Sequence, residues 1–347
     1  MSQLRAEPLA GTGPARLVRA TVGCHPEDVE EVGGKAVGLG RLLRAAQPVP
    51  ESFVVTAEAY RRFVADGADS VAQESVDAIA AGYAELCARR GATIPVAVRS
   101  SATVEDSEDA SCAGQFRTFL GACGPEQVVE EVRACWLSAF APHVDAYRGS
   151  RAGAAGPGDV AVVVQELVDA RAAGVMFTQH PRSGDRSLVV IEASYGLGEA
   201  VVGGEAVPDL LEVNKITRQV VARTKGSKAH EYRLRPSGDK VERVEVAEDR
   251  RAEWSISDEE VAALVETACQ LEAALGRGLD TEWALGAVAG ASGPPQLFAL
   301  QVRPITVDGA AARPGAGAAA PASGGAGSFS AVDLILGRLS GPGPGTP

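Results

Sequence analysis

Two stretches at opposite ends of the chain decide the fold: VAVRSSATVEDS at residues 96–107, and TEWAL at residues 281–285 together with QVRPI at residues 301–305. Each contains an apolar run with polar residues at alternate positions, which is typical of a β-strand that has two different faces. In the last strand this period of two predicts Gln301 and Arg303 on one face. The opposite face is expected to carry Phe298, Leu300 and Val302.

Four polar side chains in these stretches have the chemistry of a site for a metal-bound polyphosphate: Arg99, Glu282, Gln301 and Arg303. A guanidinium group matches the geometry of phosphate, and carboxylate and amide oxygens suit magnesium. Each residue also has a plainer interpretation. For Arg99 taken alone, a surface salt bridge beside a serine-rich turn is the favoured interpretation. The other three are equally compatible with the solvated face of a two-stranded hairpin.

The bulk properties of the chain narrow the classes of partner. A length of 347 residues predicts two domains or one large two-lobed unit. The formal net charge of -12 argues against nucleic acid or an acidic membrane as a partner, because both reward a clustered basic face. Any anion must therefore be bound by a local site.

Cysteine usage and hydropathy predict a cytoplasmic protein. The 6 cysteines form no CxxC pair, which favours reduced thiols over a disulfide framework or a zinc ribbon. The N-terminal residues lack the apolar core of a signal peptide, and no apolar run approaches the roughly 20 residues of a membrane helix. We expect no membrane partner.

The segment GGKAVGLG at residues 33–40 predicts a glycine-rich loop that enters a helix. In such a loop Lys35 can neutralise a phosphate close to the backbone amides. The spacing is not that of a Walker motif, because Ala36 stands where the magnesium-binding hydroxyl would be. A tight turn with an exposed lysine is equally compatible.

The later segment GLGEAVVGGEAVPD has the spacing GxGxxxxG, and Pro208 interrupts the helix that should follow, so a dinucleotide-binding fold is disfavoured.

Alternating strand and helix patterns organise the rest of the chain. A helix is expected after Thr56 as its N-cap, others over 70–90 and 125–147, and one from Ser257, with Glu260 completing a capping box. Four β-rich runs predict one mixed or antiparallel sheet, at residues 160–168, 172–179, 187–194 and 209–215. We expect an N-terminal extension at 1–20, one large folded unit at 21–307, and a flexible Ala/Gly/Pro-rich tail at 308–347 with a short helix at 329–339.

Six motifs occur in a fixed order between Gly33 and Thr306: GGKAVGLG, VPESFVVTAEAY, VAVRSSATVEDSEDASCAGQF, VVVQELVDARAAGVMFTQHPRSG, VVIEASYGLGEAVVGGEAVPD, and TEWAL followed by QVRPIT. Together they resemble the N-terminal ATP-binding domain of the phosphoenolpyruvate synthase and pyruvate phosphate dikinase family, which is also found in rifampin phosphotransferases. The resemblance implies an α+β or α/β fold, a two-lobed ATP-grasp with mixed-to-antiparallel sheets and a cleft between the lobes.

The resemblance also implies ATP and Mg²⁺ as cofactors and assigns roles to residues. Lys35 and Arg99 would contact the phosphates, and Arg303 would cover those being transferred, so these three are the implied catalytic residues. Glu282 and Gln301 would hold magnesium. Gly114 and Thr118 match a flap over the phosphates, and the hinge from Gln165 through Glu166 to Val168 would line the adenine with backbone groups.

Members of this family continue into a domain with a phosphorylated histidine and a domain for the acceptor, whereas this sequence continues into its Pro/Gly tail. None of His25, His143, His180 and His230 lies at a glycine-flanked helix start that would present an imidazole to a phosphoryl group. The leading hypothesis is therefore a phosphotransferase that acts on a histidine of a separate partner protein. The alternatives are a free-standing ATP-dependent kinase or ligase for a small molecule, and a non-catalytic nucleotide-binding module.

Overall fold

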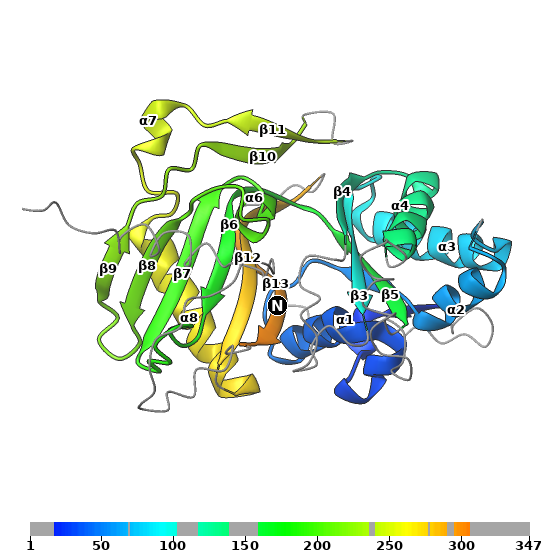
Figure 1. Ribbon diagram of the computed structural model, residues 1–347, viewed down its shortest axis with the longest axis horizontal. Helices are drawn as coiled ribbons and strands as arrows, with labels where there is room; N and C mark the ends of the chain where they lie inside the picture. The colour runs from blue at the N-terminus through cyan, green and yellow to red at the C-terminus, as the bar shows by residue number, and fades with distance from the viewer. Residues whose placement is uncertain are drawn as a thin grey trace, which may run out of the picture.

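The computed structural model describes residues 17–68, 70–102, 117–138, 159–235, 240–276, 278–289 and 295–305. These residues form two lobes that lie side by side, each built on one β-sheet, with a hairpin above them (Figure 1). Gly114, His143, the C-terminal part of the helix expected over 125–147, and the expected tail and its short helix at 329–339 lie outside the described residues.

The first lobe contains a 5-stranded sheet in the order β1-β2-β5-β3-β4. Its strands are β1 (Val18–Ala20), β2 (Ser52–Val55), β3 (Val96–Ala102), β4 (Thr118–Ala122) and β5 (Val160–Glu166). Strand β1 begins within the stretch expected to be an N-terminal extension. One face of the sheet is covered by the helices α2 (Ala57–Ala65), α3 (Gln73–Arg90) and α4 (Pro125–Ser138), whose aromatic residues pack against the valines of β3 and β5. Thr56 is the residue before α2, but its side chain makes no capping hydrogen bond.

The second lobe contains a 6-stranded sheet in the order β13-β12-β6-β7-β8-β9. Its strands are β6 (Val168–Phe177), β7 (Leu188–Tyr195), β8 (Asp209–Asn214), β9 (Val220–Thr224), β12 (Leu279–Val288) and β13 (Gln296–Pro304). All pairings in both sheets are antiparallel among the described residues. The expectation of one sheet for the four β-rich runs is wrong for the first run, because β5 pairs with β2 and β3 in the other lobe. Only Leu167 separates β5 from β6.

Shorter elements complete the described chain. The turns η2 (Thr21–Gly23) and η3 (Pro26–Asp28) precede α1 (Val29–Arg44), α6 (Glu199–Val202) follows β7, and α7 (Glu248–Arg251) follows a hairpin of β10 (His230–Leu234) and β11 (Val241–Glu245). No described helix is long and apolar enough to cross a membrane. No disulfide bond joins the cysteines that the structure describes, which are Cys24, Cys87, Cys123, Cys135 and Cys269.

Helix α1 corrects the prediction of a glycine-rich loop at residues 33–40. The motif lies inside the helix, which is kinked at Gly33, where φ is 74°. Glycine is required there because a Cβ would collide with the carbonyl oxygen of Ser101 on β3. The Ser101 hydroxyl bridges the kink, accepting from the amide of Ala36 at 3.3 Å and donating to the carbonyl of Val32 at 2.9 Å. The kink thus docks α1 on the first sheet.

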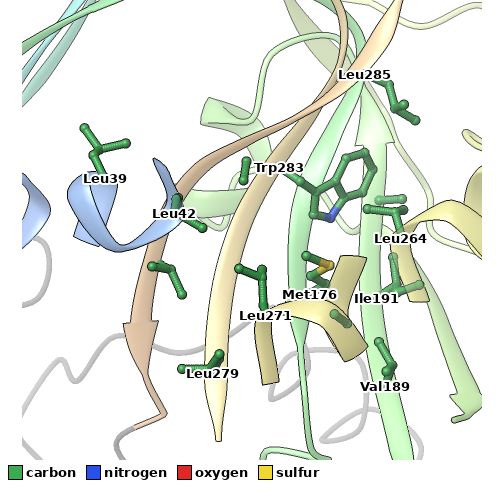
Figure 2. Packing of buried hydrophobic residues seen from close by; sticks show 14 of the residues in the cluster. Leu39, Leu42, Met176, Val189, Ile191, Leu264, Leu271, Leu279, Trp283 and Leu285 are labelled. Carbon is green, nitrogen blue, oxygen red and sulfur yellow. The ribbon is translucent and has the colours of Figure 1, made fainter. Parts of the chain in front are cut away.

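One continuous apolar core joins the lobes beneath the space between them. It combines Val54 and Val163 of the first sheet with Leu39 and Leu42 of α1 and with the inner face of the second sheet (Figure 2). Helix α8 (Asp258–Leu275) covers that face, and Figure 2 shows Trp283 beside Met176, Leu264 and Ile191. The predicted capping box starts α8, since the Ser257 hydroxyl accepts from the Glu260 amide and the Glu260 carboxylate from the Ser257 amide.

A β-bulge in the β12–β13 pair corrects the predicted faces of the last strand. Glu282 lies opposite Gln301 and Trp283 opposite Ala299, so Leu300 is the extra residue. The bulge restarts the alternation, and Phe298 and Leu300 therefore join the apolar cluster between the lobes, whereas Val302 packs into the core below. The expectation that all three share one face is wrong.

Candidate functional site

A cavity of about 90 Å³ lies between the lobes. Most of its wall is apolar, as is typical of small-molecule sites. The wall comes from β3 and β4 of the first lobe, from β6 and β12 of the second, and from the hinge between β5 and β6. Leu167, Val168 and Ala284 belong to one apolar cluster along this wall. Polar groups gather at one side of it.

Strand register places those polar groups in rows. Glu282 of β12 lies between Gln301 of β13 and Val175 of β6, and Val175 lies opposite Glu192 of β7. The adjacent row along β12 pairs Asp280 with Arg303. Directly opposed residues of an antiparallel pair share a face, so Gln301, Glu282, Asp280 and Arg303 all lie on one face of the second sheet.

An ion pair joins the lobes in the cavity. The Arg99 guanidinium on β3 donates from Nη2 to Glu282 Oε2 at 2.5 Å and from Nη1 to the carbonyl of Leu300 at 3.5 Å. The two side chains are 12% and 18% exposed, and the buried Nε of Arg99 has no hydrogen-bond partner within the described part of the chain. Arg99 therefore does form a salt bridge, but within the cavity rather than at the outer surface.

The charges of three cations converge on Glu282. Burial alone raises the pKa of this carboxyl, but the charges of Arg99, Arg303 and Lys35, together with the Arg99 hydrogen bond, hold its pKa below the ordinary value. Lys35 reaches this region from the kinked helix α1, which packs against both β3 and β13. Lys35 is half-buried and lies within a helix, so the interpretation of an exposed lysine in a plain turn is wrong.

Arg303 and Asp280 form a second pair on the same face. The Arg303 Nε donates to Asp280 Oδ2 at 2.9 Å, and the side chains are 51% and 12% exposed. Burial raises the pKa of the Asp280 carboxyl; the Arg303 charge opposes this and the Glu282 charge adds to it. The alternative of a solvated hairpin face holds only for Arg303, because Gln301 is 8% exposed and Glu282 is largely buried.

Two buried amide atoms have no partner among the described residues: Gln301 Oε1 and Gln165 Nε2. Buried polar atoms are nearly always satisfied, so each is suited to a ligand atom or ordered water. Gln301 Oε1 lies opposite the Glu282 carboxylate in the sheet register, and a carboxylate with an amide oxygen is a donor set that Mg²⁺ accepts. Gln165 Nε2 is a donor on a residue that lines the cavity.

The hinge lines the cavity, but the Glu166 side chain is used elsewhere. Its carboxylate is fully buried and accepts from Arg90 Nε at 2.6 Å and Arg90 Nη2 at 2.7 Å. It also accepts from the amide of Glu51 at 3.0 Å. The hinge therefore faces the cavity with backbone groups and with the side chains of Gln165 and Val168.

The β10–β11 hairpin packs against the apolar cluster that forms part of the cavity wall. Tyr232 of β10 and Val241 of β11 pack on the apolar cluster that also holds Leu120 of β4, so this hairpin contacts both lobes (Figure 1). The amide of Leu197 donates to the carbonyl of Tyr232 at 2.8 Å. Below it, Glu199 of α6 lines the cavity, and burial raises its pKa against the lowering charge of Arg99.

The predicted site residues thus divide into groups. Six line the cavity itself: Arg99, Thr118, Gln165, Glu166, Val168 and Glu282. Three lie beside it, namely Gln301 and Arg303 through strand register and Lys35 through its charge on Glu282. Sequence reasoning missed Asp280, Glu199 and Arg90. Sequence reasoning could have found Asp280, because this residue stands two positions before Glu282 and the period of a strand places both on one face.

Comparison with known proteins decides the family. Residues 29–77 and 68–319 match the family described as pyruvate phosphate dikinase, AMP/ATP-binding domain. The chain belongs to this family. The family description names AMP and ATP as the ligands of this domain. The resemblance noted from the six motifs is confirmed.

Curated relatives extend beyond this chain. A probable phosphoenolpyruvate synthase of Archaeoglobus fulgidus is 35% identical over 312 residues, covering 80% of this chain and 40% of that protein. A rifampicin phosphotransferase of Streptomyces sp is 35% identical over 306 residues, covering 80% and 34%. The prodigiosin synthesizing transferase PigC of Serratia marcescens is 37% identical over 290 residues, covering 79% and 31%. The chain thus spans less than half the length of these relatives.

Proposed function

We propose that this AMP/ATP-binding domain takes the β- and γ-phosphates of magnesium-bound ATP as one pyrophosphoryl group and transfers them to a histidine of a separate protein. The observation that carries the proposal is the Arg99–Glu282 pair, which joins the two lobes inside the cavity at 2.5 Å with the charges of Lys35 and Arg303 close by. Arg99, Lys35 and Arg303 bring three cationic groups to one end of the cavity, and guanidinium and ammonium groups are the usual partners of phosphate oxygens. A triphosphate is the anion that we propose for this end.

The apolar end and the polar end of the cavity suit the two ends of ATP. Adenine would lie against the hinge, where Gln165 and Val168 offer an unpartnered amide donor and an apolar wall. The phosphates would lie at the Arg99 end, with Thr118 of β4 at their edge and Gly114 in a flap over them. Lys35, Arg99 and Arg303 then neutralise charge as the phosphoanhydride bond breaks.

Magnesium fits the donor set of this face. Glu282 and Gln301 would hold the ion, because the Glu282 carboxyl has a lowered pKa and Gln301 offers a buried carbonyl oxygen that no described residue binds. When bound, the ion supplies charge neutralisation between adjacent phosphates and orients them. The residues of this chain position the nucleotide and exclude water around it.

The histidines that the structure describes support the choice of a partner's histidine as acceptor. None of His25, His180 and His230, the histidines within the described part of the chain, lines it. In the proposed reaction an imidazole nitrogen of the partner attacks the β-phosphorus. The bond from that phosphorus to the oxygen bridging to the α-phosphate breaks, AMP leaves with the bond's electron pair, and the β- and γ-phosphates stay together on the imidazole.

The test is nucleotide analysis after incubation of the full chain with ATP and magnesium, with and without a co-purifying histidine-bearing protein. We expect AMP only when both proteins are present, and acid-labile label on the partner from ATP labelled at the β-phosphate. Complete ATP turnover without a second protein would contradict the partner. Release of ADP with a small metabolite would instead favour a free-standing kinase.

A further inference from the structure

Trp283 on β12 carries a buried hydrogen-bond donor that no step of the proposed reaction uses. The residue is 1% exposed and packs in the core of the second sheet, yet its indole Nε1 has no hydrogen-bond partner among the described residues. A buried indole N–H usually finds an acceptor. The donor is therefore suited to an oxygen atom that a ligand or an ordered water supplies.

The position of the indole is set by β6. Trp283 lies opposite Gly174 in the strand register, and a Cβ at position 174 would lie 3.1 Å from the indole Cζ2. A larger residue at Gly174 would therefore displace the ring. Figure 2 shows the indole nitrogen on the ring edge nearer to Met176. The N–H group thus has a defined direction on the core side of the sheet.

A second cavity, of about 310 Å³, lies on this side of β12. Pockets for small molecules have volumes of about 300 Å³ upwards, so this cavity is large enough for one. Trp283 lines it from the sheet, and Ala263 and Thr267 line it from α8. The connection after α1 forms a third wall, where the carbonyl of Pro48 accepts from the amide of Ala299 at 2.9 Å.

The wall of this second cavity has no charged side chain within the described part of the chain. Its polar side chains are Thr267 and three glutamines, Gln47, Gln270 and Gln296. Gln47 Nε2 donates to Gln270 Oε1 at 3.3 Å, which links the connection after α1 to α8. An ionic ligand would lose its hydration here without meeting an opposite charge. A neutral ligand would not have that cost.

The polar groups of the wall match an amide. The indole N–H requires an acceptor, which a carbonyl oxygen provides, and each glutamine side chain offers both a donor and an acceptor. Met176, Leu297 and Pro48 supply apolar surface for the rest of such a molecule.

We infer that the second cavity is a binding site for a small neutral amide with an apolar body, whose carbonyl oxygen accepts from Trp283 Nε1. The inference is independent of the proposed function. The two cavities lie on opposite faces of β12, and Trp283 borders both. Glu282 precedes Trp283, and consecutive residues of a strand point to opposite faces.

The probe is benzamide, which combines a neutral amide with an aromatic ring. Benzoate and benzylamine have the same ring and a negative or a positive charge, so they test whether the site selects a neutral molecule. The readout is the indole N–H signal in nuclear magnetic resonance spectra of the ¹⁵N-labelled full chain. The chain contains 3 tryptophans, and the signal that is missing in Trp283→Phe belongs to Trp283.

We expect benzamide to move the Trp283 indole proton downfield and saturably, because the proton gains an acceptor. Neither charged probe should move it at the same concentration. The signals of Trp136 and Trp254 should stay in place, since neither residue lines the cavity.

Two neighbouring alanines of α8 supply a matched pair of variants. Both are exposed, but Ala263 lines the cavity, whereas Ala262 lines a different groove beside β9. Ala263→Phe places a ring in the cavity and should raise the half-saturating benzamide concentration at least about tenfold, the equivalent of one lost hydrogen bond. Ala262→Phe should leave it within about twofold of the wild type.

A Trp283 signal that benzamide leaves unmoved would overturn the inference, with ordered water as the partner of the indole. An equal shift with all three probes would overturn the neutral class of ligand, and an unchanged half-saturation in Ala263→Phe would overturn the location. Circular dichroism shows which variants are folded. If Trp283→Phe does not fold, Trp136→Phe and Trp254→Phe assign the Trp283 signal by elimination.

Discussion

Two arginine–glutamate pairs in this chain have the same chemistry and opposite surroundings. At the hinge, Glu166 is fully buried and accepts three hydrogen bonds, two from Arg90 and one from the amide of Glu51. In the cavity, Glu282 accepts from one nitrogen of Arg99, and the buried Arg99 Nε has no partner among the residues that the structure describes. The hinge pair lies within one lobe, whereas the cavity pair connects the two.

The two pairs differ in how far the described residues satisfy them. A buried ion pair offsets its desolvation only when its remaining hydrogen-bonding groups are satisfied. The Arg90–Glu166 pair meets this condition among the described residues and the Arg99–Glu282 pair does not. Two atoms near Glu282 lack a partner among these residues, Arg99 Nε and Gln301 Oε1, and both are on residues that we propose to bind phosphate or magnesium.

The largest expected effect is on turnover and comes from changing the cavity pair. Glu282→Gln should lower AMP release in the presence of the partner by about a thousandfold, because the amide lacks the charge that binds magnesium and orders Arg99. The fold should persist. Glu212→Gln, on β8 of the same sheet and outside the cavity wall, is the matched control and should retain turnover. Unaltered turnover in Glu282→Gln would refute the magnesium assignment.

The second effect is on the free energy of unfolding, and here the hinge pair is expected to matter more than the cavity pair. Glu166→Ala should lower the free energy of unfolding by about 3 kcal/mol, because it leaves Arg90 and the Glu51 amide without their acceptor in a buried place. Glu282→Ala should lower it by about 1 kcal/mol, since the cavity lets water reach Arg99. Urea denaturation of both variants measures the contrast. Equal losses of unfolding free energy would contradict the claim that the hinge pair stabilises the fold more than the cavity pair does.

The smallest effect is a pH dependence that sharpens the contrast within the cavity. The Asp280 carboxyl has a pKa raised by burial above its ordinary 3.8, so the folded state binds its proton more tightly than the unfolded state does. Its contribution therefore destabilises the fold increasingly as the pH rises from about 4 through the folded pKa. Asp280→Asn should be more stable than the wild type at pH 7, and this gain should vanish at acid pH.

Glu282 should behave in the opposite way, which supplies the control. Its pKa is lowered by Arg99, Arg303 and Lys35 against burial, so its charge stabilises the fold above its ordinary 4.5, and this contribution is lost as the pH falls through the folded pKa. Melting curves of Asp280→Asn and Glu282→Gln between acid and neutral pH give both slopes. A gain for Asp280→Asn that does not change with pH would contradict the raised pKa.

Sequence predicted what local patterns determine. The capping box at Ser257 and the shared face of Gln301 and Arg303 both follow from short periods, and both are confirmed. The grouping of Lys35 with Glu282 came from the order of motifs rather than from spacing. Its structural basis, a helix kinked at Gly33 and docked on Ser101, depends on a contact between segments about 70 residues apart in the chain.

The errors arose where partners are distant. A strand's sequence does not say which sheet it joins, and β5 pairs with β2 and β3 although β6 follows it immediately. One extra residue at Leu300 moved Phe298 to the cavity side, and a bulge has no local signature here. The Arg90–Glu166 pair was invisible for the same reason, because 76 positions separate its members.

The most direct test is a crystal structure of the chain with Mn²⁺ in place of Mg²⁺ and a non-hydrolysable ATP analogue. We predict an anomalous peak between the Glu282 carboxylate and Gln301 Oε1, the triphosphate against Lys35, Arg99 and Arg303, and the adenine at the hinge. A nucleotide bound elsewhere, or a metal peak away from Glu282, would contradict the claim that residues from both ends of the chain form one triphosphate site.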